Sequence, residues 1–265
     1  MSLNIKADGP VTWAAASLAA ALGLGLLAPV HARQPATAAT GATGGEVGDP
    51  LIAFNRASFG FTRGVDRWAM GPIVRGYMAL TPRRVRARLG AAVANLGEPV
   101  TALNALAQGH ARQASRATGR FVINSTLGVA GLFDVAARAG LEPREADFGQ
   151  TLGRYGARPG AYVFLPLLGP TTVRDGLGRI ADSLADPISL ASGGYGSDFG
   201  RARLGATAVT QREAADPAVR ALEDAADPYA AVRAAYLQHR AFVVAQARGE
   251  AAKLPDFEPI AATDL

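Results

Sequence analysis

Charged side chains flank one uncharged segment of the chain, residues 159–173. Arginine guanidinium groups pair well with phosphate, because their N–H donors match its oxygens in geometry and charge. One interpretation is therefore a site for a phosphate-bearing ligand. The other is a set of intramolecular ion pairs that hold the ends of the segment. The flanking charges are Asp147, Arg154, Arg158, Arg174, Asp175 and Arg179.

The uncharged segment itself is apolar and contains three prolines, Pro159, Pro166 and Pro170. Prolines at this spacing prevent a continuous helix, so an irregular apolar loop or a short hairpin is expected. Irregular backbone at membrane depth requires protein or a water-filled cavity to satisfy its polar groups. A loop that lines a cavity would meet this requirement.

The sequence offers little material for catalysis. It contains no cysteine, which excludes disulfides, thiolate metal sites and a cysteine nucleophile. His31, His110 and His239 are the only histidines, so neither a zinc site nor a Ser-His-Asp triad is indicated. The glycines form no Walker loop or dinucleotide fingerprint. We expect a protein that is not an enzyme and binds no metal or cofactor.

Composition narrows the class of protein. Hydrophobic residues make up 49% of the chain and charged residues 18%, against about 25% charged in a typical soluble domain. The net charge is +5, but the basic residues are scattered and are not interleaved with aromatic residues. Nucleic-acid binding is therefore not expected.

The N-terminus has the pattern of an export signal. Residues 1–32 combine Lys6, an apolar stretch and a small-residue site that predicts cleavage after Ala32. The alternative is an uncleaved anchor, because the uncharged residues 9–30 are long enough to cross a bilayer core. Residues 33–48 are rich in Gln, Pro, Ala, Thr and Gly and are expected to form a flexible linker.

Residues 49–248 are expected to form one all-α domain, followed by a C-terminal tail at 249–265. Helical spacing of apolar residues predicts helices over 51–68, 80–96 and 229–243. The uncharged residues 121–133 are too few to span a membrane and suit a buried, re-entrant or interfacial segment. Four Asp-Pro pairs each predict a helix start, with Asp as the capping residue: Asp49-Pro50, Asp186-Pro187, Asp216-Pro217 and Asp227-Pro228.

Several motifs, in the same order along about 200 residues, resemble those of the MlaA/VacJ family. The block at residues 147–175 is the most recognisable of them. The matching residues are Asp49-Pro50-Leu51 with Phe54-Asn55-Arg56, Asn95-Leu96-Gly97-Glu98-Pro99, Arg120-Phe121-Val122-Ile123-Asn124, Gly131-Leu132-Phe133-Asp134, Asp147-Phe148-Gly149-Gln150-Thr151-Leu152-Gly153, Tyr155-Gly156, Leu165-Pro166-Leu167-Leu168-Gly169-Pro170, Arg174-Asp175 and Asp227-Pro228-Tyr229.

The resemblance implies a ring of amphipathic and interfacial helices on the periplasmic side of the outer membrane, within its inner leaflet. A polar channel through the ring would remove phospholipids misplaced in the outer leaflet and pass them to a soluble periplasmic carrier similar to MlaC. This transport would maintain lipid asymmetry, commonly with the protein bound to a trimeric porin, and no chemistry would be done on the lipid.

The chemistry of the side chains indicates candidate roles for particular residues within such a channel. The Arg83, Arg84, Arg86 and Arg88 cluster would meet lipid phosphates or a porin rim, or form a solvated face. The wall or gate of the channel would be formed by Asp147, Arg154, Tyr155, Arg158, Tyr162, Phe164, Arg174 and Asp175. The membrane would be faced by Phe54, Phe59, Phe121, Ile123, Leu132 and Phe133.

One departure from the family concerns attachment. Members typically carry a lipidated cysteine after the signal peptide, and this sequence has none. Attachment would then depend on apolar helix faces and porin contact, or on an uncleaved N-terminus. Two other functions remain open: a non-catalytic scaffold associated with a porin, and a periplasmic lipid hydrolase, which the missing triad disfavours.

Overall fold

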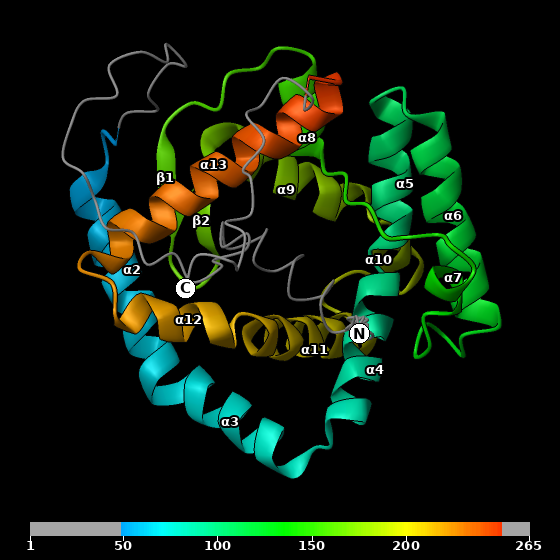
Figure 1. Cartoon of the computed structure of the whole chain (residues 1–265), viewed down its shortest axis with the longest axis horizontal. Coiled ribbons are helices and arrows are strands. Elements are labelled where there is room, and N and C mark those ends of the chain that lie inside the picture. The colour runs from blue at the N-terminus through cyan, green and yellow to red at the C-terminus, as the bar shows by residue number, and fades with distance from the viewer. Residues whose placement is uncertain (1–48, 251–265) are drawn as a thin grey trace, which may run out of the picture.

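The computed structural model describes residues 49–250. The predicted signal peptide at 1–32, the predicted linker at 33–48 and residues 251–265 of the predicted tail lie outside this part of the chain. Helices dominate the described chain, and its β structure is one small hairpin, which confirms the all-α prediction with a short hairpin in the proline-rich segment (Figure 1).

The helices vary from short turns to the long α13 near the C-terminus, and one π-helical segment, η1, joins α2 to α3. The two strands pair antiparallel, with Tyr162 opposite Thr172 and Leu165 opposite Gly169. The elements are α2 Ile52–Val65, η1 Asp66–Met70, α3 Gly71–Leu80, α4 Arg83–Asn95, α5 Glu98–Ala107, α6 Ala111–Thr126, α7 Val135–Arg138, α8 Phe148–Arg154, β1 Tyr162–Leu165, β2 Gly169–Thr172, α9 Val173–Ala185, α10 Pro187–Ala191, α11 Asp198–Ala214, α12 Asp216–Glu223 and α13 Pro228–Arg248.

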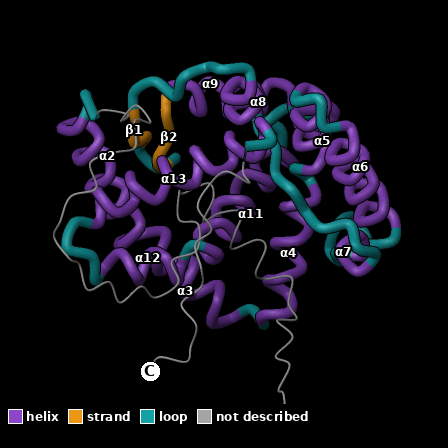
Figure 2. Tube along the Cα trace, turned by 45° about the horizontal axis from the view of Figure 1, so that its top comes forward, coloured by secondary structure: helices purple, strands orange, loops and turns teal. Residues whose placement is uncertain are grey.

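The first helices of the described chain, α2 to α6, follow the periphery of the body in Figure 1. Helices α2 and α3 lead to a corner with α4, and the antiparallel pair α5 and α6 stands beside α4. The hairpin lies on the opposite side, where α13 packs against β2 and α8 (Figures 1 and 2). Helix α11 packs against both α3 and α4 and runs across the body above the corner that they form.

Helix boundaries agree with the sequence pattern except where a proline intervenes. The helix predicted over 51–68 is present as α2 and η1. The helix predicted over 80–96 begins only at Arg83, because Leu80 ends α3 and Thr81 is extended before Pro82. The backbone of a residue before proline is driven away from the helical region, which explains the break.

The Asp-Pro pairs had two different outcomes. Asp186 and Asp227 cap α10 and α13, with their side chains accepting hydrogen bonds from the backbone N–H of Ile188 and Ala230. Asp49 does not cap α2, because its carboxylate accepts hydrogen bonds from Asn55 and the Tyr229 hydroxyl. Asp216 is also not a capping residue: it lies in the first turn of α12.

The hairpin is fixed to α2 by the fully buried side chain of Asn55. Its amide Nδ2 donates to the Tyr162 carbonyl over 3.1 Å, and its Oδ1 accepts from the Phe164 backbone N–H over 2.8 Å. One side chain therefore pairs with the free edge of β1 as a neighbouring strand would, and satisfies buried backbone groups that water cannot reach.

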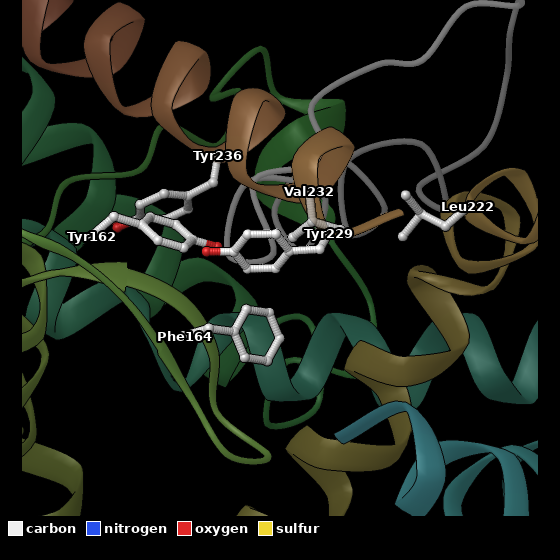
Figure 3. Packing of buried hydrophobic residues seen from close by; sticks show 6 residues of the cluster. All are labelled: Tyr162, Phe164, Leu222, Tyr229, Val232 and Tyr236. Carbon is white, nitrogen blue, oxygen red and sulfur yellow. The ribbon is translucent and has the colours of Figure 1, made fainter. Parts of the chain in front are cut away.

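A small aromatic core lies between the hairpin, α2 and α13 (Figure 3). The rings of Phe59 and Phe164 meet edge to face, with centroids 5.3 Å apart, and Tyr162 contacts the rings of Tyr229 and Tyr236 in the same way. Edge-to-face pairs add about 0.5–1.5 kcal/mol to the burial of each ring. This cluster holds α13 over the hairpin.

Replacement of Asn55 by alanine should lower the free energy of unfolding by about 2–4 kcal/mol, because it leaves two buried backbone groups of β1 without partners. Thermal unfolding in mild detergent, followed by circular dichroism, measures the effect. Thr62→Val is the matched control: it removes the hydroxyl that accepts from the exposed Leu167 N–H at the hairpin turn and donates to the Ser58 carbonyl within α2, and it should change stability by much less. Equal effects of the two substitutions would contradict the anchoring role of Asn55.

Candidate functional site

A network of charged side chains lies next to strand β2, where α8, α9 and α13 meet. At its centre the Asp175 carboxylate accepts hydrogen bonds from the Tyr236 hydroxyl over 2.8 Å and from Arg240 Nε and Nη2 over 3.0 and 2.8 Å. Arg174 and Thr172 donate to the same carboxylate. Asp175 is thus saturated with donors from β2, α9 and α13.

Arg240 also joins Asp147 to this network. Its Nη1 and Nη2 donate to the two carboxylate oxygens of Asp147 over 2.6 and 3.0 Å, and Asp147 caps α8 through the Gln150 N–H. Burial alone would raise the pKa of Asp147 and Asp175, but the Arg240 charge outweighs it and holds the pKa of both below the usual value. Both carboxylates are therefore ionised at neutral pH.

Glycines allow α8 and α9 to approach closely enough for this network to form. A Cβ atom on Gly178 would lie 2.4 Å from the Gly149 backbone nitrogen, and one on Gly149 would lie 2.6 Å from Asp175 Oδ1. A side chain at position 178 would require the backbone of α8 to move, and one at position 149 would displace the paired groups of Asp175 and Arg240. This contact accounts for the glycine that follows Asp147-Phe148 in the most recognisable block.

A second buried network joins α5, α6 and α7. Arg120 Nε donates to Glu98 over 2.5 Å, and the guanidinium also contacts both oxygens of Asp134. Burial raises the pKa of Glu98 despite this arginine. Helices α5 and α6 pack here through the small side chains of Ala105 and Ala114. The interior around this second network therefore consists of ion pairs and small residues.

Helix α9 has its polar face inside and its apolar face outside. Arg174, Asp175 and Gly178 are buried against α8 and α13. The opposite stripe exposes Val173, Leu177, Ile180 and Leu184, at 49, 58, 59 and 72% of their surfaces. In a protein surrounded by water, an amphipathic helix buries its apolar face and exposes its polar face.

The same inversion occurs on other helices. Helix α2 buries Asn55 and Ser58, and α5 buries Asn104 within the α5–α8 contact. Contiguous exposed apolar surface of this kind marks a site of contact with a membrane or a partner. Outside α9 the exposed apolar side chains include Ile52, Phe54, Phe61, Trp68, Ile73, Leu80, Leu103, Leu106, Val122, Leu127, Val129, Leu167, Leu168 and Leu190.

The structure contradicts part of the predicted channel wall. Tyr162 and Phe164 are 0 and 4% exposed and pack in the aromatic core, so their placement on the channel wall is wrong. Arg174 and Asp175 are 7 and 3% exposed and pair with each other. Asp147 is engaged by Arg240. For these three residues the ion-pair interpretation is the one that agrees with the structure.

The other three predicted site residues lie nearer the surface. Arg154 donates to the Ala247 carbonyl in the last turn of α13 and contacts His110 Nε2 at 3.2 Å. Tyr155 is 70% exposed, and its hydroxyl donates to the Ala107 carbonyl over 2.6 Å. Arg158 is exposed and makes no ion pair within residues 49–250. Tyr155 and Arg158 are therefore the predicted residues that a ligand can reach.

The residues predicted to face a membrane divide similarly. Phe54 and Phe133 are 50 and 38% exposed. Phe59 packs against the aromatic core, so its outward placement is wrong. The remaining three, Phe121, Ile123 and Leu132, are half-buried.

Sequence reasoning missed the central role of Arg240. A signal was available, because Arg240 follows Tyr229, Val232 and Tyr236 on the stripe of α13 that the fold buries. A charged residue on a buried stripe needs a buried partner of opposite charge. Nothing local to α13 identifies Asp147 or Asp175 as those partners.

Two further observations concern residues 49–250. No helix there combines the length and apolarity needed to cross a bilayer. No three His, Asp or Glu side chains gather there as a metal ion would require.

A helical fold with an ion-paired interior and an apolar exterior defines a class of protein built for contact with lipid. The comparison of sequences gives the family: residues 47–243 match the MlaA lipoprotein family, and the chain belongs to it. Two relatives are named "Intermembrane phospholipid transport system lipoprotein MlaA". That of Haemophilus influenzae is 33% identical over 75% of this chain and 80% of its own, and that of Escherichia coli is 32% identical over 74% and 78%.

An uncharacterized protein of Rickettsia typhi is 35% identical over 72% of this chain and 75% of its own. One solved structure, reported as the "Structural basis for maintenance of bacterial outer membrane lipid asymmetry", superposes with a TM-score of 0.66. It is 33% identical and covers 74% of this chain and 99% of its own.

Replacement of Arg240 by methionine should lower the free energy of unfolding by about 3–5 kcal/mol, because it leaves the buried carboxylate of Asp175 and the half-buried carboxylate of Asp147 without their shared cation. Urea unfolding in detergent measures this loss. The matched control is Arg201→Met, which breaks an ion pair between exposed side chains and should leave stability unchanged. A stable Arg240→Met protein would show that the network does not hold the fold.

The natural chain and the Arg240→Met variant should also differ in how their stability depends on pH. In the natural chain the depressed pKa of Asp147 and Asp175 gives stability that is complete above about pH 4 and is lost as pH falls through the folded-state pKa. Without Arg240, burial raises the pKa of these carboxyls, so the folded variant takes up protons. The stability difference between the two proteins should therefore narrow between pH 7 and pH 4, and a constant difference would contradict this account.

Proposed function

We propose that this chain transports phospholipids in a bacterial envelope. It would take lipids from the outer membrane and pass them to a soluble periplasmic carrier. The observation that carries the proposal is α9, which buries Arg174 and Asp175 and exposes Val173, Leu177, Ile180 and Leu184. Lipid tails are the natural surroundings of such a stripe. The names of the relatives, which specify intermembrane phospholipid transport, support the same conclusion.

We further propose that the helices lie within the periplasmic leaflet of the outer membrane, after export through the predicted signal. The sequence has no cysteine to carry a lipid anchor. In-plane amphipathic helices bind a leaflet through buried apolar area, and one acyl chain adds only a marginal anchor. The outward side chains of α2, α5 and α9 supply that area. A trimeric porin is the proposed neighbour in the membrane.

Of the predicted channel residues, we propose that Arg158 and Tyr155 meet the lipid headgroup. Both follow α8 and keep exposed side chains, and Arg158 makes no ion pair within the described chain. An exposed guanidinium group without an ion pair can bind phosphate. We propose no catalytic step, because transport requires only that the lipid be bound and released.

The transport proposal is tested by purification in detergent and by complementation of a bacterium that lacks its own MlaA homologue. Phospholipid should co-purify with the full chain, and its acyl chains should remain intact on incubation. The complemented cells should regain a phospholipid-poor outer leaflet. Release of free fatty acid would favour a hydrolase, and normal asymmetry without any co-purifying lipid would favour a scaffold.

Double replacement of Leu177 and Leu184 by lysine should remove the chain from the outer-membrane fraction and abolish complementation, since each charge opposes insertion of the α9 stripe. Folding in detergent should be retained, because both side chains are exposed. The matched control, Gln211→Lys with Gln238→Lys, adds the same charge at exposed polar positions of α11 and α13 and should behave as the natural chain. Membrane fractionation and immunoblotting distinguish these outcomes.

A further inference from the structure

Basic residues occur throughout the chain, but one stretch lacks the acidic residues that balance them elsewhere. Between Arg67 and Gly97 there are six arginines and no acidic residue, whereas the formal net charge of the whole chain is +5. The rest of the chain is therefore close to neutral. The stretch, residues 67–97, comprises most of η1 together with α3 and α4 and is called the basic arm below.

Three of the six arginines are engaged within the protein. Arg86 pairs with Glu213 of α11, Arg88 lies 3.8 Å from the centroid of the Phe133 ring, and Arg67 stacks on Trp68. The other three, Arg75, Arg83 and Arg84, are exposed and make no ion pair within residues 49–250. Half of the charge of the basic arm is thus directed outward without a partner in that part of the chain.

The basic arm also exposes large apolar side chains. Helices α3 and α4 meet in a corner at the periphery of the molecule, as Figure 1 shows, and α11 packs on the arm between them. Leu80 at this corner is 86% exposed and Trp68 in η1 is 80% exposed. Tryptophan and arginine together are typical of the boundary between lipid headgroups and acyl chains.

Folding alone gives no reason for this arrangement. Arginines in the first turn of α4 oppose the helix dipole, and Pro82 before them offers no side-chain cap. Repulsion among like charges adds to this cost. The arginines at the start of α4 destabilise that helix unless an external group supplies the negative charge that they lack. Binding of such a group therefore accounts for their presence.

We propose that the basic arm binds the headgroup surface of an anionic phospholipid leaflet, with Trp68 and Leu80 inserted below the phosphates. The inference rests on the proposed membrane function and adds a headgroup preference to it. An acidic protein is the alternative occupant. The exposed Trp68 and Leu80 favour lipid, because they require an apolar layer beside the negative charge.

Vesicle flotation of the full chain tests the proposal. Detergent-purified protein is mixed with vesicles of phosphatidylcholine alone or with added phosphatidylglycerol, and the detergent is then removed. The apolar helix faces should give binding to both kinds of vesicle, and phosphatidylglycerol should strengthen it. Each arginine near an anionic surface contributes about fivefold to affinity, so three give roughly 100-fold at low salt, falling as salt is added.

The decisive variant replaces Arg75, Arg83 and Arg84 by glutamine. It should lose the phosphatidylglycerol-dependent binding and keep the binding to phosphatidylcholine. Its melting temperature should be unchanged or higher, because the removed charges oppose the α4 dipole; a structural role would lower it. The matched control replaces Arg112, Arg138 and Arg144, three exposed arginines outside the basic arm, and should bind as the natural chain does.

Each other result overturns the inference in a recognisable way. Equal binding of the natural chain to both vesicles overturns the headgroup preference and leaves the membrane function standing. An equal loss in the control variant shows that total charge, not the basic arm, is responsible, and also overturns it. Loss of an envelope protein partner by the triple variant, without any change in vesicle binding, assigns the arm to an acidic protein. Absence of binding to either vesicle overturns the proposed membrane function together with this inference.

Discussion

One guanidinium group shared by two carboxylates, Asp175 buried and Asp147 half-buried, determines how the parts of this protein fit together. Arg240 of α13 binds Asp147 at the start of α8 and Asp175 in the first turn of α9. Each carboxylate also has a local task, since Asp147 caps α8 and Asp175 accepts from Thr172 and Tyr236. Because buried charges are stable only when every lone pair and proton finds a partner, the positions of three helices and the hairpin are fixed at once. The aromatic core between the hairpin, α2 and α13 requires α13 to lie in the same place.

A polar interior of this kind is possible because the apolar side chains are on the outside. In water, burial of large apolar residues is the main force that holds a fold together, and this chain has a small aromatic core for its size. Its helices instead approach through Gly149, Gly178, Ala105 and Ala114, as helices in membranes commonly do. When lipid surrounds the exposed stripes, hydrogen bonds and close packing are sufficient, so the fold and the proposed location in the leaflet depend on each other.

The sequence predicted most elements but not the direction in which they face. Prolines at 166 and 170 indicated the hairpin, and Asp186 and Asp227 marked true helix starts, because these signals act within a few residues. The identical Asp-Pro pair at Asp49 gave no cap, since Asn55 and the distant Tyr229 occupy its carboxylate. Likewise Tyr162 and Phe164, placed on the channel wall because charges flank them, are buried by α2 and α13. Which side of a segment is covered depends on partners about a hundred residues away, and no local pattern encodes them.

Some arginines of this chain are buried with a carboxylate and others are exposed, and this difference limits where a phosphate can bind. Arg120, Arg174 and Arg240 are buried with carboxylates at hydrogen-bonding distance. A phosphate could take such a guanidinium only by displacing a carboxylate and leaving it buried and unpaired, at a cost of several kcal/mol. Exposed arginines such as Arg83 and Arg158 bear no such cost. Headgroup contact is therefore expected at exposed arginines such as Arg158, within the 147–175 block, while the ion-paired residues at the two ends of that block, Asp147, Arg174 and Asp175, hold α8, α9 and α13 together.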